Sequence, residues 1–406
     1  MRFTEIGEAL SFVMSRQKKN HRAADLKQVL KDLGDPQEEL QCVHITGTNG
    51  KGSFLAYLMY LLKGRGKKVG TFSSPHYLTH LDRIRINGEN IPAEVFLRLL
   101  NERMELIEEN DLGMFDIDLL IMLEWFREEK VDYALIEAGI GGRHDSTNIL
   151  QHPSLTVITT VGMDHMEVLG PTLQSIAYDK AGIAREGCPL LYGELPPEAA
   201  AVVREEAQSV HAPYSTLQPI VNTAPRHFLY RGQEYALRSY AVYQPHNASL
   251  ALEAFRILIG EPDEREKISL QEAHWPGRFE IVHEDPTVVL DGAHNPPAVA
   301  ALCASMKILP GKKAVLFGAL KRKQYAAMIG MLKGNCDCLC VTSFPYPQAV
   351  DPFTVAGEGF EREKDYEAAF FRLIRDYDSV ILCGSLYFLS EIAANPRLQA
   401  YFSGNK

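Results

Sequence analysis

No stretch of the sequence approaches the roughly 20 consecutive apolar residues that a membrane-spanning helix needs. The N-terminal segment 1–14 also lacks the continuous apolar run and the small-residue cleavage site of a signal peptide. These two absences argue against a membrane protein and against a secreted one. We therefore expect a cytoplasmic protein with no membrane partner.

Cysteine is scarce, and its spacing does not suit a metal site. The seven cysteines include an alternating run, CDCLC at 336–340, but no C-x-x-C pair and no nearby histidines at ligand spacing. Side chains that alternate along the chain share one face of a β-strand, where free cysteine packs as a small apolar residue. The run therefore predicts a buried strand and no zinc site.

A surplus of positive charge is also missing. The sequence has 42 Lys and Arg against 52 Asp and Glu, which gives a formal net charge of -10. General nucleic-acid binders gain their affinity from Lys and Arg on phosphates, so this balance argues against that class. A local cluster of cations can still hold a small anion. We expect small-molecule substrates and no nucleic-acid partner.

The composition that remains is that of a globular protein. The 406 residues are 46% hydrophobic and 23% charged, and the length favours two or three domains. The first half repeats a short apolar run, a glycine-rich turn and a helical segment, as in LQCVHITG followed by FLAYLMYLLKGRG. This alternation predicts an α/β fold with a parallel, doubly wound sheet, whose ligands lie at the carboxyl ends of the strands.

The pattern changes twice along the second half. The segment HFLYRGQEYALR, residues 227–238, predicts a β-hairpin around Arg231-Gly232. A charged, turn-rich stretch at 260–280 then precedes a second α/β series with four apolar runs. We place the domain boundary between 277 and 278, which gives an N-terminal domain of residues 1–277 and a smaller C-terminal Rossmann-like domain of residues 278–406.

The segment HITGTNGKGS, residues 44–53, is similar to a phosphate-binding loop but departs from the common G-x-x-x-x-G-K-[ST] pattern. Ile45 occupies the position of the first glycine, and an extra glycine separates Lys51 from Ser53. An apolar strand precedes the loop and a helical pattern follows it, so backbone N–H groups and the helix dipole would face an anion. We predict a nucleotide site in which Lys51 reaches the outer phosphates and Ser53 offers its hydroxyl to Mg²⁺. The alternative is a glycine-rich turn with a surface lysine.

Other polar residues follow other predicted strands. Glu137 ends an apolar run before a glycine loop, where a carboxylate can hold Mg²⁺ directly or through water, although a capping role fits equally. Ser74 and His165 stand at similar positions, and each fits a structural role as well as a ligand role. Lys180 falls on the apolar face of the predicted helix PTLQSIAYDKAGI. Such a lysine either snorkels to solvent or enters a site where its charge state can change.

Taken together, these motifs resemble the folylpolyglutamate synthase/dihydrofolate synthase family, whose members are ATP-dependent amide ligases related to the Mur ligases. The resemblance rests on GTNGKGS (47–53), SPH (74–76), EAGIGGRHDSTN (137–148), GMDHMEVLG (162–170), DKAGI (179–183), HWPGRFE (274–280), DGAHNP (291–296) and GSLY (384–387). It spans nearly the whole chain in order. It implies a P-loop ATPase-like N-terminal domain that binds ATP and folate, a C-terminal Rossmann-like ligase domain and a cleft between them.

The resemblance also implies a reaction. ATP phosphorylates a carboxylate of the folate substrate, and the amine of L-glutamate then attacks the acyl phosphate. The implied acceptor is tetrahydrofolate, with dihydropteroate as a further candidate. ATP, two Mg²⁺ ions and a carbamylated lysine at Lys180 are the implied cofactors, and we expect a monomer. Two alternatives stay open: a Mur-type ligase with another acceptor, and a non-catalytic nucleotide-binding paralogue.

The family's functional residues carry over position by position. Catalysis is implied for Lys51, Glu137, His165 and Lys180. The nucleotide is implied to contact the loop residues Gly47, Thr48, Asn49, Gly50, Lys51, Gly52 and Ser53, together with Asn247, Arg278, Asp291 and His294. The implied Mg²⁺ shell, direct or through water, is Ser53, Ser74, Glu137, His165 and carbamylated Lys180. Arg83 lies on the segment that approaches the acyl substrate.

Two departures from the family pattern concern the substrate more than the nucleotide. The family's F-E-x-x-T stands here as Phe115-Asp116-Ile117-Asp118-Leu119, and the acidic pattern expected after GALK stands as Arg322-Lys323-Gln324. The first departure shortens a glutamate and replaces a threonine near the metal and substrate side. The nucleotide motifs are unchanged, so substrate choice is the property that these departures put in question.

Overall fold

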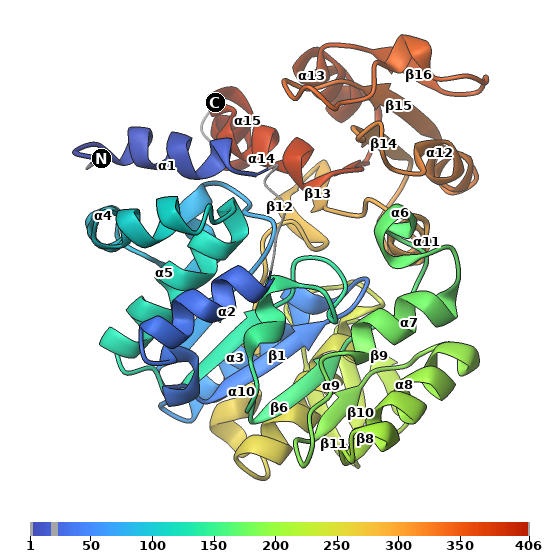
Figure 1. The fold of residues 1–406 in the computed structure, drawn as a ribbon. Coiled ribbons are helices and arrows are strands. Elements are labelled where there is room, and N and C mark those ends of the chain that lie inside the picture. Colours follow the sequence, from blue (N-terminus) through green and yellow to red (C-terminus); the bar gives the residue numbers. More distant parts are fainter. Residues whose placement is uncertain (1–2, 18–22, 405–406) are drawn as a thin grey trace. The chain divides into compact units, whose positions relative to one another are not determined.

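A computed structural model of the chain describes residues 3–17 and 23–404 (Figure 1). Their contacts divide the chain into two compact units. Unit 1 consists of Met1–Thr223, His227–Ala236 and His246–Ala273, and unit 2 consists of Ala224–Arg226, Leu237–Pro245 and His274–Lys406. The domain boundary expected between 277 and 278 stays a prediction.

Unit 1 is built on an eight-stranded sheet. Its strands are, in spatial order, β4 (Glu89–Asn90), β3 (Ile84–Ile86), β2 (Val69–Phe72), β5 (Tyr133–Glu137), β1 (Cys42–Thr46), β6 (Leu155–Ile158), β7 (Leu190–Tyr192) and β8 (Tyr214–Thr216). Strands β2 to β8 in this order run parallel, whereas β3 and β4 form an antiparallel edge. The central strands are buried along their whole length, as parallel strands covered on both faces are. The predicted parallel α/β sheet is confirmed.

Helices connect these strands (Figure 1). The helices of unit 1 are α1 (Ile6–Ser15), α2 (Ala23–Asp32), η1 (Pro36–Glu39), α3 (Lys51–Gly64), η2 (His80–Arg83), α4 (Ala93–Glu109), α5 (Met114–Glu128), η3 (Ser146–Ile149), α6 (Met166–Leu169), α7 (Leu173–Ala181), α8 (Pro197–Ser209), α9 (Gln244–Leu258, which begins in unit 2) and α10 (Glu264–Glu272). Helix α3 follows β1 after the glycine loop, as the sequence predicted.

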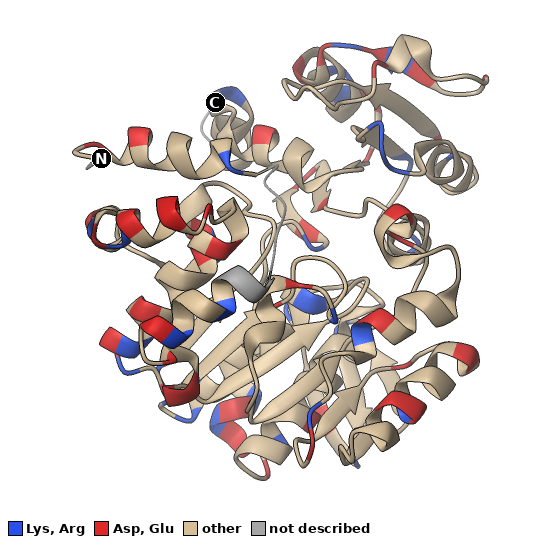
Figure 2. Cartoon of the chain, in the orientation of Figure 1, with Lys and Arg blue, Asp and Glu red and all other residues tan. Residues whose placement is uncertain are grey.

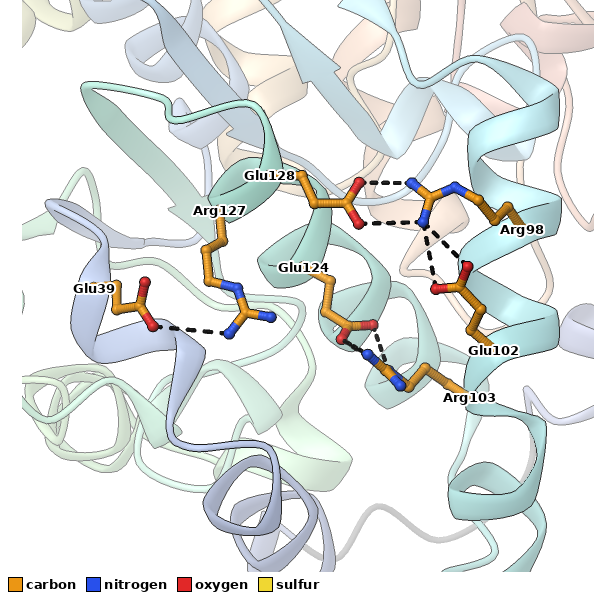
Figure 3. A network of polar contacts seen from close by, with 7 residues as sticks. All are labelled: Glu39, Arg98, Glu102, Arg103, Glu124, Arg127 and Glu128. Atoms are coloured by element: carbon orange, nitrogen blue, oxygen red, sulfur yellow. Dashed lines mark hydrogen bonds and ion pairs between the residues drawn. The ribbon is translucent and has the colours of Figure 1, made fainter.

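Helix α5 is buried on every side from residue 114 to residue 126. A helix that is buried all round must pair any charge that it carries. Glu124, which is 2% exposed, accepts hydrogen bonds from Nε of Arg103 in α4 with both carboxylate oxygens at 2.8 Å. Figure 3 shows this pair beside a more exposed ion pair between Arg98 and Glu128. These contacts join α4 and α5.

A separate three-stranded sheet in the order β11-β10-β9 is formed by β9 (Ile220–Ala224), β10 (His227–Tyr230) and β11 (Gln233–Ala236). Tyr230 pairs with Gln233 in antiparallel register, which leaves Arg231 and Gly232 as the turn. Both turn residues have positive φ, 50° and 73°, the conformation of a two-residue hairpin turn. The predicted hairpin is confirmed.

Unit 2 contains a six-stranded sheet. Its strands are, in spatial order, β12 (Glu280–Glu284), β13 (Thr287–Asp291), β17 (Ser379–Cys383), β14 (Lys313–Phe317), β15 (Cys338–Thr342) and β16 (Glu361–Glu363). Its helices are α11 (Pro296–Met306), α12 (Tyr325–Lys333), η4 (Pro352–Thr354), α13 (Tyr366–Asp376), α14 (Leu386–Ala394) and α15 (Pro396–Phe402).

The four inner strands of this sheet are those expected from the sequence, and the two edge strands are additional. Strand β12 pairs antiparallel and leaves most of its residues partly or fully exposed, so it carries no apolar run that would predict it. In β15, Cys338 and Cys340 are buried free thiols, which confirms the predicted strand there.

Within the described residues, no helix combines the length and the apolar character that crossing a membrane requires.

A substitution of Gly70 in β2 can test how closely the sheet packs on α5. A Cβ atom at Gly70 would lie 2.6 Å from Cε2 of Phe126, a fully buried ring. We expect Gly70→Ala to lower the free energy of unfolding by roughly 1–3 kcal/mol, the usual cost of overpacking a core, in urea denaturation. Gly7→Ala in α1 is the control, because no atom of the described residues lies within 4 Å of a Cβ there. Equal stability of the two variants would contradict the close packing.

Candidate active site

The carboxyl ends of β1, β5 and β2 lie side by side, because β5 pairs in parallel with both neighbours. Glu137 at the end of β5 is the one Asp, Glu, Lys or Arg within β1, β2, β5 and β6, strands that are largely uncharged in Figure 2. Its carboxylate is only 4% exposed and therefore needs a partner. Nζ of Lys51 lies 3.7 Å from its Oε1.

The glycine loop before α3 has the backbone geometry of an anion-binding turn. Gly50 adopts a left-handed conformation with φ 86° at the N-cap of α3, which begins at Lys51. A Cβ at Gly47 would lie 1.9 Å from Oγ1 of Thr159, so only glycine fits there. The N–H groups of the first helical turn point toward this loop. Nζ of Lys51 donates to the carbonyl oxygen of Gly47 at 3.0 Å, which places the amine over the loop.

The loop is fixed against the segment that follows β6. The backbone N–H of Thr48 donates to the carbonyl of Thr160 at 2.8 Å, and that of Asn49 donates to Oγ1 of Thr160 at 2.9 Å. The hydroxyl of Thr48 also bonds with the backbone of Gly162. His165 follows shortly after, at the start of α6 with φ 51°, and its Nε2 lies 3.9 Å from Oδ2 of Asp164. The structure therefore brings the segment of His165 to the loop.

Lys180 lies on the buried face of α7 and is 3% exposed, which confirms its predicted orientation. Burial, and next the positive charge of Lys51, lower the pKa of its amine to about 7. The carboxylates of Asp179, Asp164 and Asp145 act in the opposite direction. Because these charges influence one another, Lys180, Lys51 and the three carboxylates belong to one electrostatic neighbourhood.

The loop after Glu137 is held by residues that the sequence analysis did not single out. Asp145 accepts hydrogen bonds from the backbone N–H of Ile140 at 2.9 Å and of Thr147 at 3.0 Å, and burial raises the pKa of its carboxyl. Asp179 accepts from the backbone N–H of Gly142 at 2.8 Å. An aspartate before Ser-Thr-Asn is a common helix N-cap, and this signal in the sequence could have revealed the role of Asp145.

Most of the predicted site residues of unit 1 share this edge of the sheet. Asn247 in α9 joins the loop, because a Cβ at Gly50 would lie 2.5 Å from its Oδ1. Ser53 is buried in the first turn of α3, and Ser74 follows β2, the strand next to that of Glu137. Arg83 faces a different partner: its Nε lies 3.7 Å from Oδ2 of Asp118 in α5.

The three remaining predicted residues lie in unit 2 around the end of β13. The carboxylate of Asp291 accepts hydrogen bonds from Tyr243 at 2.7 Å and from the backbone N–H of Phe279 at 3.0 Å. The pKa of Asp291 is raised, because the effect of burial is larger than the opposing effects of the Tyr243 hydrogen bond and of the Arg278 charge. Nδ1 of His294 bonds with the carbonyl of Gly292 at 2.8 Å. These residues form one group within unit 2.

Across the described part of the chain, no three His, Cys, Asp or Glu side chains converge as a metal site. The predicted Mg²⁺ shell contains only Glu137 and His165 of these types, and serine hydroxyls and Lys180 complete it. Mg²⁺ keeps several waters and is commonly bound through one or two carboxylates plus substrate phosphates. The predicted shell, with only two side chains of these types, is compatible with this absence.

Comparison with known proteins assigns both parts of the chain. Residues 45–189 match the Mur ligase middle domain, and residues 277–386 match the Mur ligase glutamate ligase domain. The chain is 34% identical over 425 residues to the dihydrofolate synthase/folylpolyglutamate synthase of Bacillus subtilis (strain 168). That alignment covers 96% of this chain and 99% of the relative.

Two solved structures share the fold. E. coli FolC in complex with DHPP and ADP has a TM-score of 0.87 at 28% identity, over 96% of this chain and 97% of that chain. The bifunctional folylpolyglutamate synthase/dihydrofolate synthase of Yersinia pestis, complexed with AMPPNP and a Mn ion, has a TM-score of 0.86 at 26% identity. The match covers 97% of this chain and 98% of that one.

The lowered pKa of Lys180 predicts a pH-dependent stability. Because the pKa is about 7 in the folded protein and 10.5 for an unperturbed lysine, protonation of Lys180 opposes folding. This penalty is complete below about pH 7 and disappears as the pH rises toward 10.5. We expect Lys180→Met to be more stable than the wild type by on the order of 4 kcal/mol near pH 6, and to lose most of this advantage by about pH 10.

Urea unfolding in bicarbonate-free buffer measures this difference. Lys63→Met is the control, because Lys63 is an exposed lysine of α3. A pH-independent difference between Lys180→Met and the wild type would refute the assigned environment of Lys180.

Proposed function

This chain belongs to the folylpolyglutamate synthase/dihydrofolate synthase family, and we propose that it uses ATP to join L-glutamate to tetrahydrofolate and also to dihydropteroate. The observation that carries the proposal is the match over 96% of this chain and 99% of the Bacillus subtilis relative, whose name states both activities. The protein is thus an ATP-dependent amide ligase. In this reaction an acceptor carboxylate oxygen attacks the γ-phosphorus of ATP and ADP leaves. The glutamate amine then attacks the acyl carbon, inorganic phosphate leaves and the amide bond forms.

The first step joins two anions, so the chain must reduce their repulsion. Lys51 is suited to this role, because its amine lies over the glycine loop. Its ion pair with Glu137 is 3.7 Å long, too long for a hydrogen bond, so the amine can still donate to a phosphate. The backbone N–H groups of the loop and the first turn of α3 add fixed positive dipoles. We assign the β- and γ-phosphates to residues 47–53 and to Asn247, which lies against Gly50.

Divalent metal fits the same edge of the sheet. Glu137 offers a buried carboxylate, Ser53 and Ser74 offer hydroxyls and His165 offers an imidazole, and oxygen donors suit Mg²⁺. Bound there, Mg²⁺ would neutralise phosphate charge. The residues themselves supply orientation: Glu137 is fixed by the end of β5, and Ser53 is fixed by the first turn of α3.

We further propose that Lys180 is carbamylated. A buried amine with a pKa of about 7 is substantially neutral at neutral pH, and only the neutral amine can attack carbon dioxide. The nitrogen forms a bond to carbon, a proton leaves, and the product is an anion on the buried face of α7. That anion would balance the charge of Lys51 and offer oxygen donors to a second Mg²⁺. Catalytic roles for Lys51, Glu137, His165 and Lys180 follow from this arrangement.

In unit 2 we assign Arg278, Asp291 and His294 to the nucleotide as well. The support is their grouping at the carboxyl end of β13, the edge where α/β sheets bind ligands. We also propose that the protein acts as a monomer in the cytoplasm on small molecules, without a nucleic-acid partner.

An ADP-release assay with tetrahydrofolate or dihydropteroate plus L-glutamate tests the proposed function. We expect turnover with at least one pteridine acceptor and none without glutamate. Turnover confined to other acceptors or other amino acids would support the Mur-type alternative, and ATP binding without any turnover would support a non-catalytic paralogue.

Lys51→Met tests the role of the loop. We expect kcat to fall by roughly 10²–10³-fold, about 2.7–4 kcal/mol of lost transition-state stabilisation, in the same assay. Lys63→Met, an exposed lysine on the same helix, is the matched control and should keep wild-type kcat. A kcat for Lys51→Met within a few-fold of wild type would rule out the assigned role.

A further inference from the structure

The segment after β2 carries polar side chains into the interior, where they meet a buried carboxylate of α5. Helix η2 (His80–Arg83) leaves His80 and Arg83 each 4% exposed, and both face Asp118 of α5, which is fully buried. The backbone N–H of Ser73 donates to the carbonyl of Arg83 at 2.9 Å, which ties the segment to the end of β2. We call His80, Arg83 and Asp118 the β2 cluster. In the F-E-x-x-T pattern Asp118 stands at an unspecified position, so the family resemblance gives it no role.

The contacts in the β2 cluster are incomplete. Nε2 of His80 hydrogen-bonds with Oδ1 of Asp118 at 2.7 Å. Nε of Arg83 lies 3.7 Å from Oδ2 of Asp118, which is an ion pair but too long for a hydrogen bond. Four polar atoms of the cluster are buried without a hydrogen-bond partner among the residues that the structure describes. They are Nε and Nη1 of Arg83, Oδ2 of Asp118 and Nδ1 of His80. Leaving such a group unpaired is costly, and buried groups of this kind call for a ligand or an ordered water.

The charges of the β2 cluster decide which ligand fits. The guanidinium of Arg83 is already compensated by the carboxylate of Asp118. An incoming carboxylate or phosphate would gain from Arg83 but would be repelled by Asp118 beside it. A neutral group that has both N–H donors and acceptors can instead pair with Oδ2 of Asp118 and with the N–H groups of Arg83.

Asp82, which belongs to the same helix η2, is already compensated. Asp82 accepts backbone hydrogen bonds from Tyr77, Leu78 and Thr79 and lies 3.7 Å from Arg85. Asp82 therefore adds no uncompensated charge to the cluster.

We propose that Asp118 and His80 are specificity-determining residues that, together with Arg83, bind the neutral heterocyclic end of the acceptor and not its carboxylate. This inference rests on the proposed function and deepens it. Strand β5, with Glu137, lies between β1 and β2. An acceptor whose carboxylate meets the nucleotide at the β1 loop therefore directs its other end past Glu137 toward β2.

Calorimetric titration with two acceptor fragments tests the proposal on the full chain with Mg²⁺ and AMPPNP present. The fragments are 6-hydroxymethylpterin, a neutral ring without a carboxylate, and p-aminobenzoylglutamate, which has carboxylates but no pterin ring. We expect Asp118→Asn to weaken ring binding by about tenfold or more, because a site built on hydrogen bonds discriminates strongly. Binding of p-aminobenzoylglutamate should not weaken. A wild type that does not bind the ring, or an equal loss for both fragments, overturns the proposal.

Two further variants separate this role from a structural one. Glu124→Gln removes another buried, ion-paired carboxylate of α5 and should leave both affinities at wild-type values (Figure 3). If it weakens ring binding as Asp118→Asn does, the effect is structural and the proposal fails. Arg83→Gln should weaken the ring fragment alone, whereas a loss confined to p-aminobenzoylglutamate would make Arg83 a carboxylate site. Because these titrations need no turnover, failure of the proposed function appears separately, in the ADP-release assay.

Discussion

The arrangement of unit 1 depends on two lysine amines, one partly exposed and one buried, whose charges influence each other. Lys51 lies over the glycine loop, and its charge is one of the causes that lower the pKa of Lys180. Lys51 is paired with Glu137, and the carboxylates near Lys180 favour the charged form of its amine, so the charges of this region are compensated. The amine of Lys51 over the loop and the backbone N–H groups of the loop supply the local positive charge that a triphosphate needs. The ion pair of Lys51 and Glu137 therefore says little about the stability of the fold, but it indicates a functional site at this edge of the sheet.

The parallel sheet makes this arrangement possible. Its strands end at one edge, so residues far apart in sequence meet without any long side chain having to reach across the fold. The loop of β1 is bonded to the segment after β6, the two regions being more than a hundred residues apart. The glycines at 47 and 50 allow the backbone itself to approach Thr159 and Asn247. A rigid backbone cradle then sets where the phosphates lie, and the lysines set their charge.

Local features could be predicted from the sequence, and long-range pairings could not. The strand, loop and helix around residue 50 follow from apolar periodicity, and the burial of Lys180 follows from its place on one face of α7. By contrast, the bond between His80 and Asp118 joins residues 38 positions apart, and neither residue has a local signature. The edge strand β12 was missed because most of its residues are partly or fully exposed. Sequence patterns report which face is apolar, but not which polar groups meet across it.

The charges along this edge divide the reaction between neighbouring strands. At β1 and β5, the amine of Lys51 and the backbone N–H groups of the glycine loop present positive charge, which suits an anionic nucleotide and the carboxylate that attacks it. At β2, the charges of Arg83 and Asp118 compensate each other. Arg83 therefore does not attract the acceptor carboxylate away from the phosphates. An acceptor with one neutral and one anionic end would therefore be oriented by charge before any specific hydrogen bond forms. Orientation of this kind brings the reactive carboxylate to the phosphates and reduces the entropy cost of the first step.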